Sequence, residues 1–477
     1  MRAPGADALE AALERHAETP AVLAAALRDL VSDVPQLTAV QLFLGFALDA
    51  AGHRKEAIAA LRAVAAGRRA GFDCLCLAAD ALTAWGTPEE AVAACTAALE
   101  IAPHASHAYL RRGRASAVAG DVTAAVEDLR HATLLQPSLV EAHLALAREL
   151  RAAGRAEAAA DSYRRALVLA PASEEAQRGL DAALCALVPP WHAAMLNDGV
   201  RAAAYDSAIR RAVRPGMHVL DIGTGTGLLA MMAARAGAAR VTACESVGPL
   251  AGMAQEIIQN KGLEDKIKVV HKSCEALDAG ADLGGRADLL VAEIVDAGLL
   301  SERVLAAFAD ARARLLAPGA PIIPRGATVY AVPVESEALY AARRVGRVAG
   351  FDLSAFNALA PRLYLQAELR HYGWRPLAAP APVFAFDFRN PDPEPAEAAI
   401  DITATADGTA QLVAFWFVLA LDDETALSTG PDAPPTHWQQ AVYALDAPFP
   451  VRAGDGMRID ARHDGNTIRL AVAPADA

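Results

Sequence analysis

The sequence of 477 residues has fewer basic than acidic residues and only six cysteines. Its formal net charge of −13 argues against a nucleic-acid-binding protein, because phosphate contacts need a basic face. The six cysteines are scattered without a Cys-x-x-Cys pair, so neither a disulfide framework nor a zinc site is indicated. No apolar run is long enough to span a bilayer, and the amino-terminal residues lack the apolar core of a signal peptide. We therefore expect a cytoplasmic protein that binds no metal and no membrane.

The composition predicts a folded protein of several domains. Hydrophobic residues make up 54% of the chain and charged residues 21%, which is typical of globular proteins. At roughly 100–200 residues per domain, the length predicts about two to four domains. The acidic balance is compatible with a basic protein or peptide as a partner.

The first third of the chain repeats with a period of 34 residues. Three sets of positions keep this period: Gly52, Gly86, Gly120 and Gly154; Ala57, Ala91, Ala125 and Ala159; Leu61, Cys95, Leu129 and Tyr163. In each unit the glycine suits a left-handed turn after one helix, the small alanine lets two helices approach, and a proline ends the second helix. Residues 38–171 therefore resemble a tetratricopeptide array, preceded by a helical segment over 1–37 and followed by a closing helix and linker over 172–188.

Such arrays present a concave groove, so the resemblance implies that residues 38–171 bind a protein or peptide partner. The alternative interpretation is a generic alanine-rich helical bundle. That alternative is disfavoured, because a bundle has no reason to keep a fixed 34-residue phase.

After the Pro189-Pro190 pair the pattern changes to alternating strands and helices, which is typical of a doubly wound α/β domain. An apolar strand over 218–222 enters the turn Gly223-Thr224-Gly225-Thr226-Gly227, and a helix follows. The glycines let the backbone approach a ligand and aim helix N–H groups at it. The G-x-G-x-G spacing differs from that of dinucleotide-binding folds, and we expect a methyltransferase domain that binds S-adenosylmethionine over 189–324.

Three acidic residues follow neighbouring predicted strands. Asp221 precedes the glycine turn, and Glu245 ends the next strand, where it could accept both ribose hydroxyls of the cofactor. Glu275 follows the third strand and could accept the adenine amino group. Any one of them alone would more often be a solvated strand end. Together with Gly223, Thr224, Gly225 and Gly227, they predict the cofactor site.

Four segments resemble the protein arginine methyltransferases, in family order, over about residues 189–450. They are Trp191–Asp198 with Arg201 and Tyr205, the Asp221–Gly227 turn with Glu245, the acidic hairpin Glu293–Glu302, and Thr436-His437-Trp438. The resemblance implies that Arg201 binds the cofactor's carboxylate and that Met195 and Cys274 belong to the cofactor site. It also implies that Glu293 and Glu302 are catalytic and that His437 and Trp438 border the acceptor pocket.

The chemistry of two carboxylates suits the guanidinium group of arginine. Guanidinium is always charged, and each carboxylate can grip it through paired, charge-assisted hydrogen bonds. The carboxylates also favour the transition state, in which positive charge moves from sulfur onto the guanidinium. Taken alone, Ser301 and Glu302 would instead suggest a helix N-cap with a residue that favours the helix dipole, and His437-Trp438 would suggest core packing.

Beyond Pro324 the sequence favours strands, because apolar and polar residues alternate with a period of two. Strands are expected over 327–334, 383–388, 411–421, 440–445, 456–461 and 467–472, which predicts a β-barrel-like domain over 325–477. The resemblance implies that this domain closes over the acceptor. Residues 340–380 interrupt the strands where the family inserts a dimerisation arm, so the resemblance also allows a homodimer.

The hairpin lacks the Met and Tyr of the members that make asymmetric dimethylarginine. No Tyr-Phe-x-x-Tyr segment lies upstream of Met195, and Ala292 stands where many members have Ser. The sequence Ile-Val-Asp-Ala-Gly-Leu-Leu resembles more closely the branch of the family whose members have duplicated modules. We therefore expect monomethyl or symmetric dimethyl products from this single module. Two alternatives stay open: methyl transfer to a small molecule or to another protein side chain, and a tetratricopeptide scaffold with a degenerate enzyme.

Overall fold

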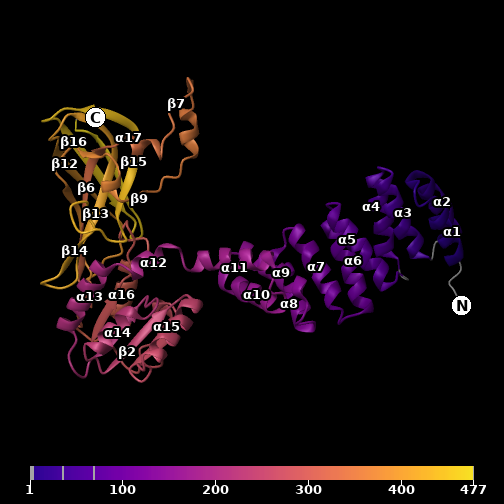
Figure 1. Cartoon of the computed structure of the whole chain (residues 1–477), viewed down its shortest axis with the longest axis horizontal. Helices are drawn as coiled ribbons and strands as arrows, with labels where there is room; N and C mark the ends of the chain where they lie inside the picture. Colours follow the sequence, from indigo (N-terminus) through magenta and orange to yellow (C-terminus); the bar gives the residue numbers. More distant parts are fainter. Residues whose placement is uncertain (1–4, 35–36, 68–69, 476–477) are drawn as a thin grey trace. The chain divides into compact units, whose positions relative to one another are not determined.

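The computed structural model describes residues 5–34, 37–67 and 70–475, and the chain divides into two compact units, Met1–Pro189 and Pro190–Ala477. The first unit is a row of helices and the second combines a parallel sheet with antiparallel sheets (Figure 1). All six cysteines are free thiols. Within the described ranges, none of the helices has the length and apolar character that a membrane span requires.

The first unit consists of helices joined by short turns. Its described helices are α1 (Ala6–His16), α2 (Pro20–Asp33), α3 (Thr38–Ala50), α4 (Arg54–Ala66), α5 (Phe72–Ala84), α6 (Pro88–Ile101), α7 (Ser106–Val118), α8 (Val122–Leu135), α9 (Val140–Ala152), α10 (Ala156–Leu169) and α11 (Glu174–Leu187). The four turn glycines of the repeat all have positive φ, between 71° and 85°, and the four periodic alanines are fully buried. The predicted helical array is therefore confirmed.

Ion pairs between neighbouring repeats follow the same period. Arg28 pairs with Glu56 and Arg62 with Glu90, and further along the array Arg114 pairs with Glu141 and Arg148 with Glu175. These side chains are largely exposed, so each pair adds little stability. The recurrence shows instead that successive repeats are stacked in the same geometry.

Helix α11 closes the array. Its apolar face buries Ala176, Leu180 and Ala183 in the same core as the last repeat. Gly179 lies directly under the ring of Tyr163, where an added Cβ would come within 2.3 Å of the ring. The predicted closing helix is therefore present, and only glycine fits at its closest approach to α10.

The second unit begins with a doubly wound parallel sheet of five strands in the order β3-β2-β1-β4-β5. Its elements are α12 (Trp191–Leu196), α13 (Gly199–Ala212), β1 (His218–Ile222), α14 (Leu228–Arg235), β2 (Arg240–Glu245), α15 (Gly248–Asn260), β3 (Ile267–His271), the short 3-10 helix η1 (Cys274–Ala276), β4 (Leu289–Ala292), α16 (Val304–Arg314) and β5 (Ile322–Ile323). The strand order reverses between β1 and β4. The crevice outside the carboxyl ends of these two strands is where open α/β sheets bind ligands.

Three antiparallel sheets complete the second unit: one of seven strands built on β6, β13 and β15, one of β12, β16 and β17, and a two-stranded sheet of β7 and β8. The elements are β6 (Gly326–Glu335), α17 (Glu337–Ala341), β7 (Arg347–Val348), β8 (Phe351–Asp352), η2 (Ser354–Leu359), β9 (Leu365–Ala367), η3 (Leu369–His371), β10 (Arg375–Pro376), β11 (Ala381–Asp387), β12 (Ala396–Thr403), β13 (Gly408–Ala420), β14 (Ala426–Ser428), β15 (Gln440–Val451), β16 (Gly456–His463) and β17 (Ile468–Pro474). The two larger sheets share one core with the parallel sheet. The predicted β domain is confirmed as curled antiparallel sheets.

The segment between α17 and β9 projects from the sheets around β7 (Figure 1). It carries a group of exposed apolar side chains, with Phe351 71% exposed and Leu359 80% exposed; the others are Val348, Leu353, Phe356 and Leu363. We call residues 342–363 the arm. A surface of this kind is typical of a contact with another protein.

Candidate active site

The glycine turn after β1 is fixed by hydrogen bonds to the neighbouring strand and to Asp221. The backbone N–H groups of Gly223 and Thr224 both donate to the carbonyl of Cys244 at 3.0 Å. One oxygen of Asp221 accepts from the Thr224 hydroxyl at 2.6 Å and from the Ala230 N–H at 3.0 Å. Burial raises the pKa of Asp221 to about 7. Asp221 therefore fixes the turn through one of its oxygens, while its second oxygen is buried without a protein partner.

Glu245 holds the same turn from the end of β2. Its carboxylate accepts the Gly225 N–H and the Val247 N–H, both at 2.9 Å, and the residue is 6% exposed. Gly225 has φ 55°, and an added Cβ there would meet no atom within 4 Å. The turn therefore faces open space next to a buried, charged acceptor, which is the arrangement that a ribose needs.

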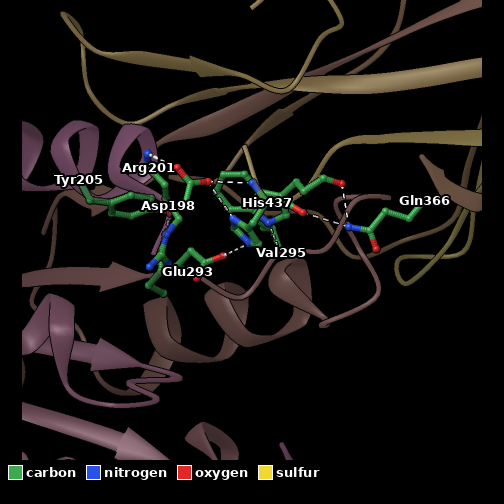
Figure 2. A network of polar contacts seen from close by, with 9 residues as sticks. Asp198, Arg201, Tyr205, Glu293, Val295, Gln366 and His437 are labelled. Carbon is green, nitrogen blue, oxygen red and sulfur yellow. Dashed lines mark hydrogen bonds and ion pairs between the residues drawn. The ribbon is translucent and has the colours of Figure 1, made fainter. Parts of the chain in front are cut away.

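Figure 2 shows a buried polar network that joins α13, the end of β4 and the loop before β15. Arg201 donates to the carboxylate of Glu293 at 2.6 Å, and both side chains are more than nine-tenths buried. Asp198 caps α13 by accepting the Arg201 N–H, and its other oxygen accepts the backbone N–H of His437 at 2.9 Å and contacts its Nδ1 at 3.1 Å. The Nε2 atom of His437 lies 4.0 Å from Glu293.

The titration behaviour of the network follows from its burial. Burial raises the pKa of Glu293 to about 8, against the opposing charge of Arg201. Glu302 is exposed. Even so, desolvation of its carboxyl group by the surrounding protein atoms, with the negative charges of Asp296 and Glu245, raises the pKa of Glu302 to about 7. Burial lowers the pKa of His437, so its neutral ring is favoured and we assign the proton to Nδ1, where it is donated to Asp198.

The loop from Glu293 to Arg303, which we call the acidic loop, is held at several points. Tyr205 donates to the carbonyl of Ala292 at 3.2 Å, and Trp438 donates from its indole nitrogen to the carbonyl of Val295 at 2.7 Å. Leu299 and Arg303 have positive φ values of 74° and 63°, a conformation that non-glycine residues rarely adopt. Strained backbone of this kind persists where the surrounding contacts enforce it, often at active sites.

The helix-cap interpretation of Ser301 and Glu302 is wrong. Helix α16 begins at Val304, its N-cap position is Arg303, and no side chain caps it. The backbone N–H of Ser301 donates instead to Asp296 at 3.2 Å, inside the loop. Glu302 is therefore part of the acidic loop rather than of the helix.

Comparisons with known proteins match all three parts of the chain. A family model described as the arginine methyltransferase oligomerization subdomain matches residues 325–470, and a methyltransferase domain model matches 219–319. A tetratricopeptide repeat model matches residues 72–104. The solved structure of the Trypanosoma brucei PRMT1 enzyme–prozyme heterotetrameric complex with AdoHcy covers 60% of this chain and 92% of its own, with 27% identity and a TM-score of 0.53.

The chain is 41% identical over 285 residues to an arginine N(omega)-methyltransferase from Streptomyces achromogenes subsp. streptozoticus, of which it covers 79%. The chain belongs to the arginine methyltransferase family. It is also 34% identical over 313 residues to protein arginine N-methyltransferase 7 of Oryza sativa subsp. indica, and it spans less than half the length of that relative (43%).

The residues present in this arginine methyltransferase fit its cofactor, S-adenosylmethionine. The open space before Gly225 would admit the ligand beside Glu245, whose charge suits the ribose hydroxyls. Nε of Arg201 is buried without a protein partner, so it has a donor to spare for a carboxylate. Among the described residues, no group of three or more His, Cys, Asp or Glu side chains is placed to hold a metal ion.

The structure brings most of the predicted site residues together, in two groups. The first group is the turn formed by the three glycines, with Asp221 and Glu245 bonded to it. The second group is the network beside it, which contains Arg201, Glu293, His437 and Trp438. Three residues fit less well. Glu302 is exposed, and no hydrogen bond or ion pair among the described residues joins it to the network. Glu275 is exposed and lies 3.8 Å from Arg303, although its neighbour Cys274 is buried. Met195 lies on α12, a six-residue helix without buried residues.

The sequence alone assigns no role to three residues that contact this site. Asp198 ends the Trp191–Asp198 segment, and its position just before a helix is typical of an N-cap. Gln366 donates to the carbonyls of His437 and Trp438 at 3.1 and 3.0 Å, and Tyr364 donates from its hydroxyl to Asp296. No local signal points to the last two, because each contact spans at least 68 residues.

Proposed function

We propose that this protein transfers the methyl group of S-adenosylmethionine to a guanidinium nitrogen of arginine in a protein substrate. The observation that carries the proposal is the pair Glu293 and Glu302 on one constrained loop, next to the turn that binds the cofactor. Two carboxylates at one site suit a planar cation with several donors. Membership of the arginine methyltransferase family supports the same acceptor chemistry.

The cofactor, when bound, supplies an electrophilic methyl group on a positively charged sulfur. Glu293, oriented by Arg201, and Glu302 would hold the guanidinium so that one nitrogen faces that methyl group. Their charges also favour the movement of positive charge onto the acceptor. Since the methylated guanidinium can lose its proton after the transfer, Glu302 only needs to be ionised and need not be a strong base.

We assign the other parts of the chain by the same reasoning. Residues 325–477 would close over the acceptor, and the exposed apolar arm would form a homodimer contact, which agrees with the match to an oligomerization subdomain. The tetratricopeptide array would bind the protein substrate or a partner protein. The free cysteines are compatible with action in the cytoplasm, where thiols stay reduced.

The product we expect is monomethyl or symmetric dimethylarginine, because the acidic loop lacks the Met and Tyr of the asymmetric members. A second candidate acceptor is arginine that is not part of a protein. It is favoured by the 41% identity to a relative whose name specifies arginine without specifying a protein.

Purified enzyme, with labelled S-adenosylmethionine, would be incubated with an arginine-rich peptide, a folded protein mixture or free arginine. Mass spectrometry of each reaction would identify the methylated species and separate the three methylarginines by fragmentation. Label on peptide or protein arginine supports the proposal. Label on free arginine alone would favour the second candidate, and label on neither would refute both.

A further inference from the structure

We propose that Tyr364 is a positioning residue for methyl transfer, which fixes the acidic loop and Glu302 through its hydrogen bond to Asp296. The inference rests on the proposed arginine methylation. Tyr364 lies where the chain returns from the arm, just before β9, and is therefore remote in sequence from the loop that it contacts.

Tyr364 contacts the acidic loop with both its hydroxyl and its ring. The hydroxyl donates to one oxygen of Asp296, while the other oxygen accepts the Ser301 N–H at 3.2 Å. The ring covers Gly298, where an added Cβ would come within 2.8 Å of the ring. The carboxylate of Asp296 thus bridges Tyr364 to the backbone just before Glu302, so a shift of Tyr364 moves the loop.

The ring of Tyr364 is itself held rigidly by the β domain. It packs edge-on against Phe415 on β13 and Tyr443 on β15, with ring centroids 5.8 and 6.1 Å apart. These two rings stack on each other at 5.7 Å. Since the cluster belongs to the central strands of the large sheet, it is a firm support for the hydroxyl of Tyr364.

The same short segment also contacts the loop that carries His437 and Trp438. Gln366, two residues after Tyr364, donates to the carbonyls of His437 and Trp438, as Figure 2 shows. Residues two apart on an extended chain lie on the same side of it. One side of this segment therefore contacts both loops that carry the proposed acceptor residues.

The charge of Asp296 explains why the hydroxyl of Tyr364 matters for chemistry. Asp296 raises the pKa of Glu302 by its negative charge. Without the hydroxyl, Asp296 would lose its only side-chain donor among the described contacts and would be free to turn toward the acceptor cation. Two effects follow: the acidic loop becomes less well fixed, and Asp296 competes with Glu302 for the guanidinium.

The test compares Tyr364→Phe with Tyr443→Phe in the full-length protein. Both changes remove one hydroxyl from the same aromatic cluster, but the hydroxyl of Tyr443 donates to the carbonyl of Ile468 and makes no hydrogen bond to the acidic loop among the described contacts. For Tyr364→Phe we expect a kcat about tenfold lower or more, unchanged affinity for S-adenosylmethionine, and an altered acidic limb in the pH profile. Tyr443→Phe should keep the wild-type values.

A readout without turnover separates this inference from the proposed function. Amide hydrogen exchange over residues 293–303 should be faster in Tyr364→Phe than in wild type or in Tyr443→Phe. Equal exchange and equal pH profiles in all three proteins would overturn the positioning role, and so would equal losses of rate in the two variants. If wild type itself methylates no arginine while exchange still responds to Tyr364→Phe, the proposed function fails and the structural coupling stands.

Discussion

Arg201 and Glu293 form a 2.6 Å ion pair in which the two side chains are only 4% and 7% exposed. The family resemblance assigns these residues to different ligands, Arg201 to the cofactor and Glu293 to the acceptor. In the structure each provides the counter-charge of the other. Because an unpaired buried charge is costly, removing either partner affects both ligand sites.

Neutral replacements of the catalytic carboxylates should lower turnover. Glu293→Gln and Glu302→Gln keep the shape of the side chain, and each should reduce kcat about a hundredfold or more, because charge stabilisation in the transition state is lost. Affinity for S-adenosylmethionine should stay near wild type for Glu302→Gln. For Glu293→Gln it should change only modestly, since Arg201 keeps an oxygen acceptor.

The matched control for these variants is Glu264→Gln, which removes an exposed carboxylate beyond the end of α15. Its rate should remain within about twofold of wild type, since exposed charges outside the site contribute little. Full activity of both Glu293→Gln and Glu302→Gln on an arginine peptide would contradict the acceptor assignment and favour another acceptor.

The rate should rise with pH through the neutral range. A carboxyl group with a raised pKa is protonated below that pKa, and Glu302 (about 7) and Glu293 (about 8) must be ionised to grip guanidinium. We therefore expect kcat/KM to increase from about pH 6 and to level off only near pH 9, about one unit above the pKa of Glu293. In Glu302→Gln the lower part of this rise should disappear; a flat wild-type profile from pH 6 to 9 would show that both groups are already ionised.

The sequence predicted those features that depend only on residues close to one another along the chain. The 34-residue period, the glycine turn after β1 and the spacing of Glu293 and Glu302 can each be read from neighbouring residues. The strand β12 was not predicted, because its sequence Ala-Glu-Ala-Ala-Ile-Asp-Ile-Thr has three alanines among its first four residues and acquires its strand character from pairing with β16.

The site could be predicted less completely than the fold. Burial, which raises the pKa of Glu293, and the pairing of Asp198 with His437, 239 residues away, depend on tertiary packing. The wrong interpretation of Ser301 as a helix N-cap had the same origin. Local capping rules favoured a helix that starts after Ser301, but the Ser301 N–H donates to Asp296 within the loop and the helix begins only at Val304. Long-range contacts of this kind leave no spacing pattern in a single sequence.

Cofactor affinity should depend on Glu245. Glu245→Ala removes a buried charged acceptor and should weaken binding of S-adenosylmethionine about tenfold or more, as measured by calorimetry. Because Glu245 also accepts the Gly225 and Val247 N–H groups, Glu245→Gln should fall between Ala and wild type. The control is Glu264→Ala, an exposed change beyond α15 that should leave affinity unaltered. Unchanged affinity in Glu245→Ala would show that the ribose binds elsewhere.

The repeat array should select the substrate without building the active site. Residues 190–477 contain every member of the polar network and of the glycine turn, and they form a compact unit of their own. A shortened protein that starts at Pro190 should therefore fold, bind S-adenosylmethionine as the full chain does, and methylate a short arginine peptide. It should lose most of its rate on the native protein substrate, because the additional binding surface is gone.

The ratio of protein rate to peptide rate is the quantity to compare between the full and shortened chains. A second variant tests the array within the full-length chain. Gly179→Leu should displace α11 from Tyr163 and loosen the end of the array while leaving residues 190–477 unchanged. Both proteins should show a lower ratio with normal cofactor affinity. A ratio equal to that of the full chain would mean that the array serves a purpose other than substrate selection. Loss of cofactor binding on shortening would mean instead that residues before Pro190 are needed to complete the methyltransferase fold.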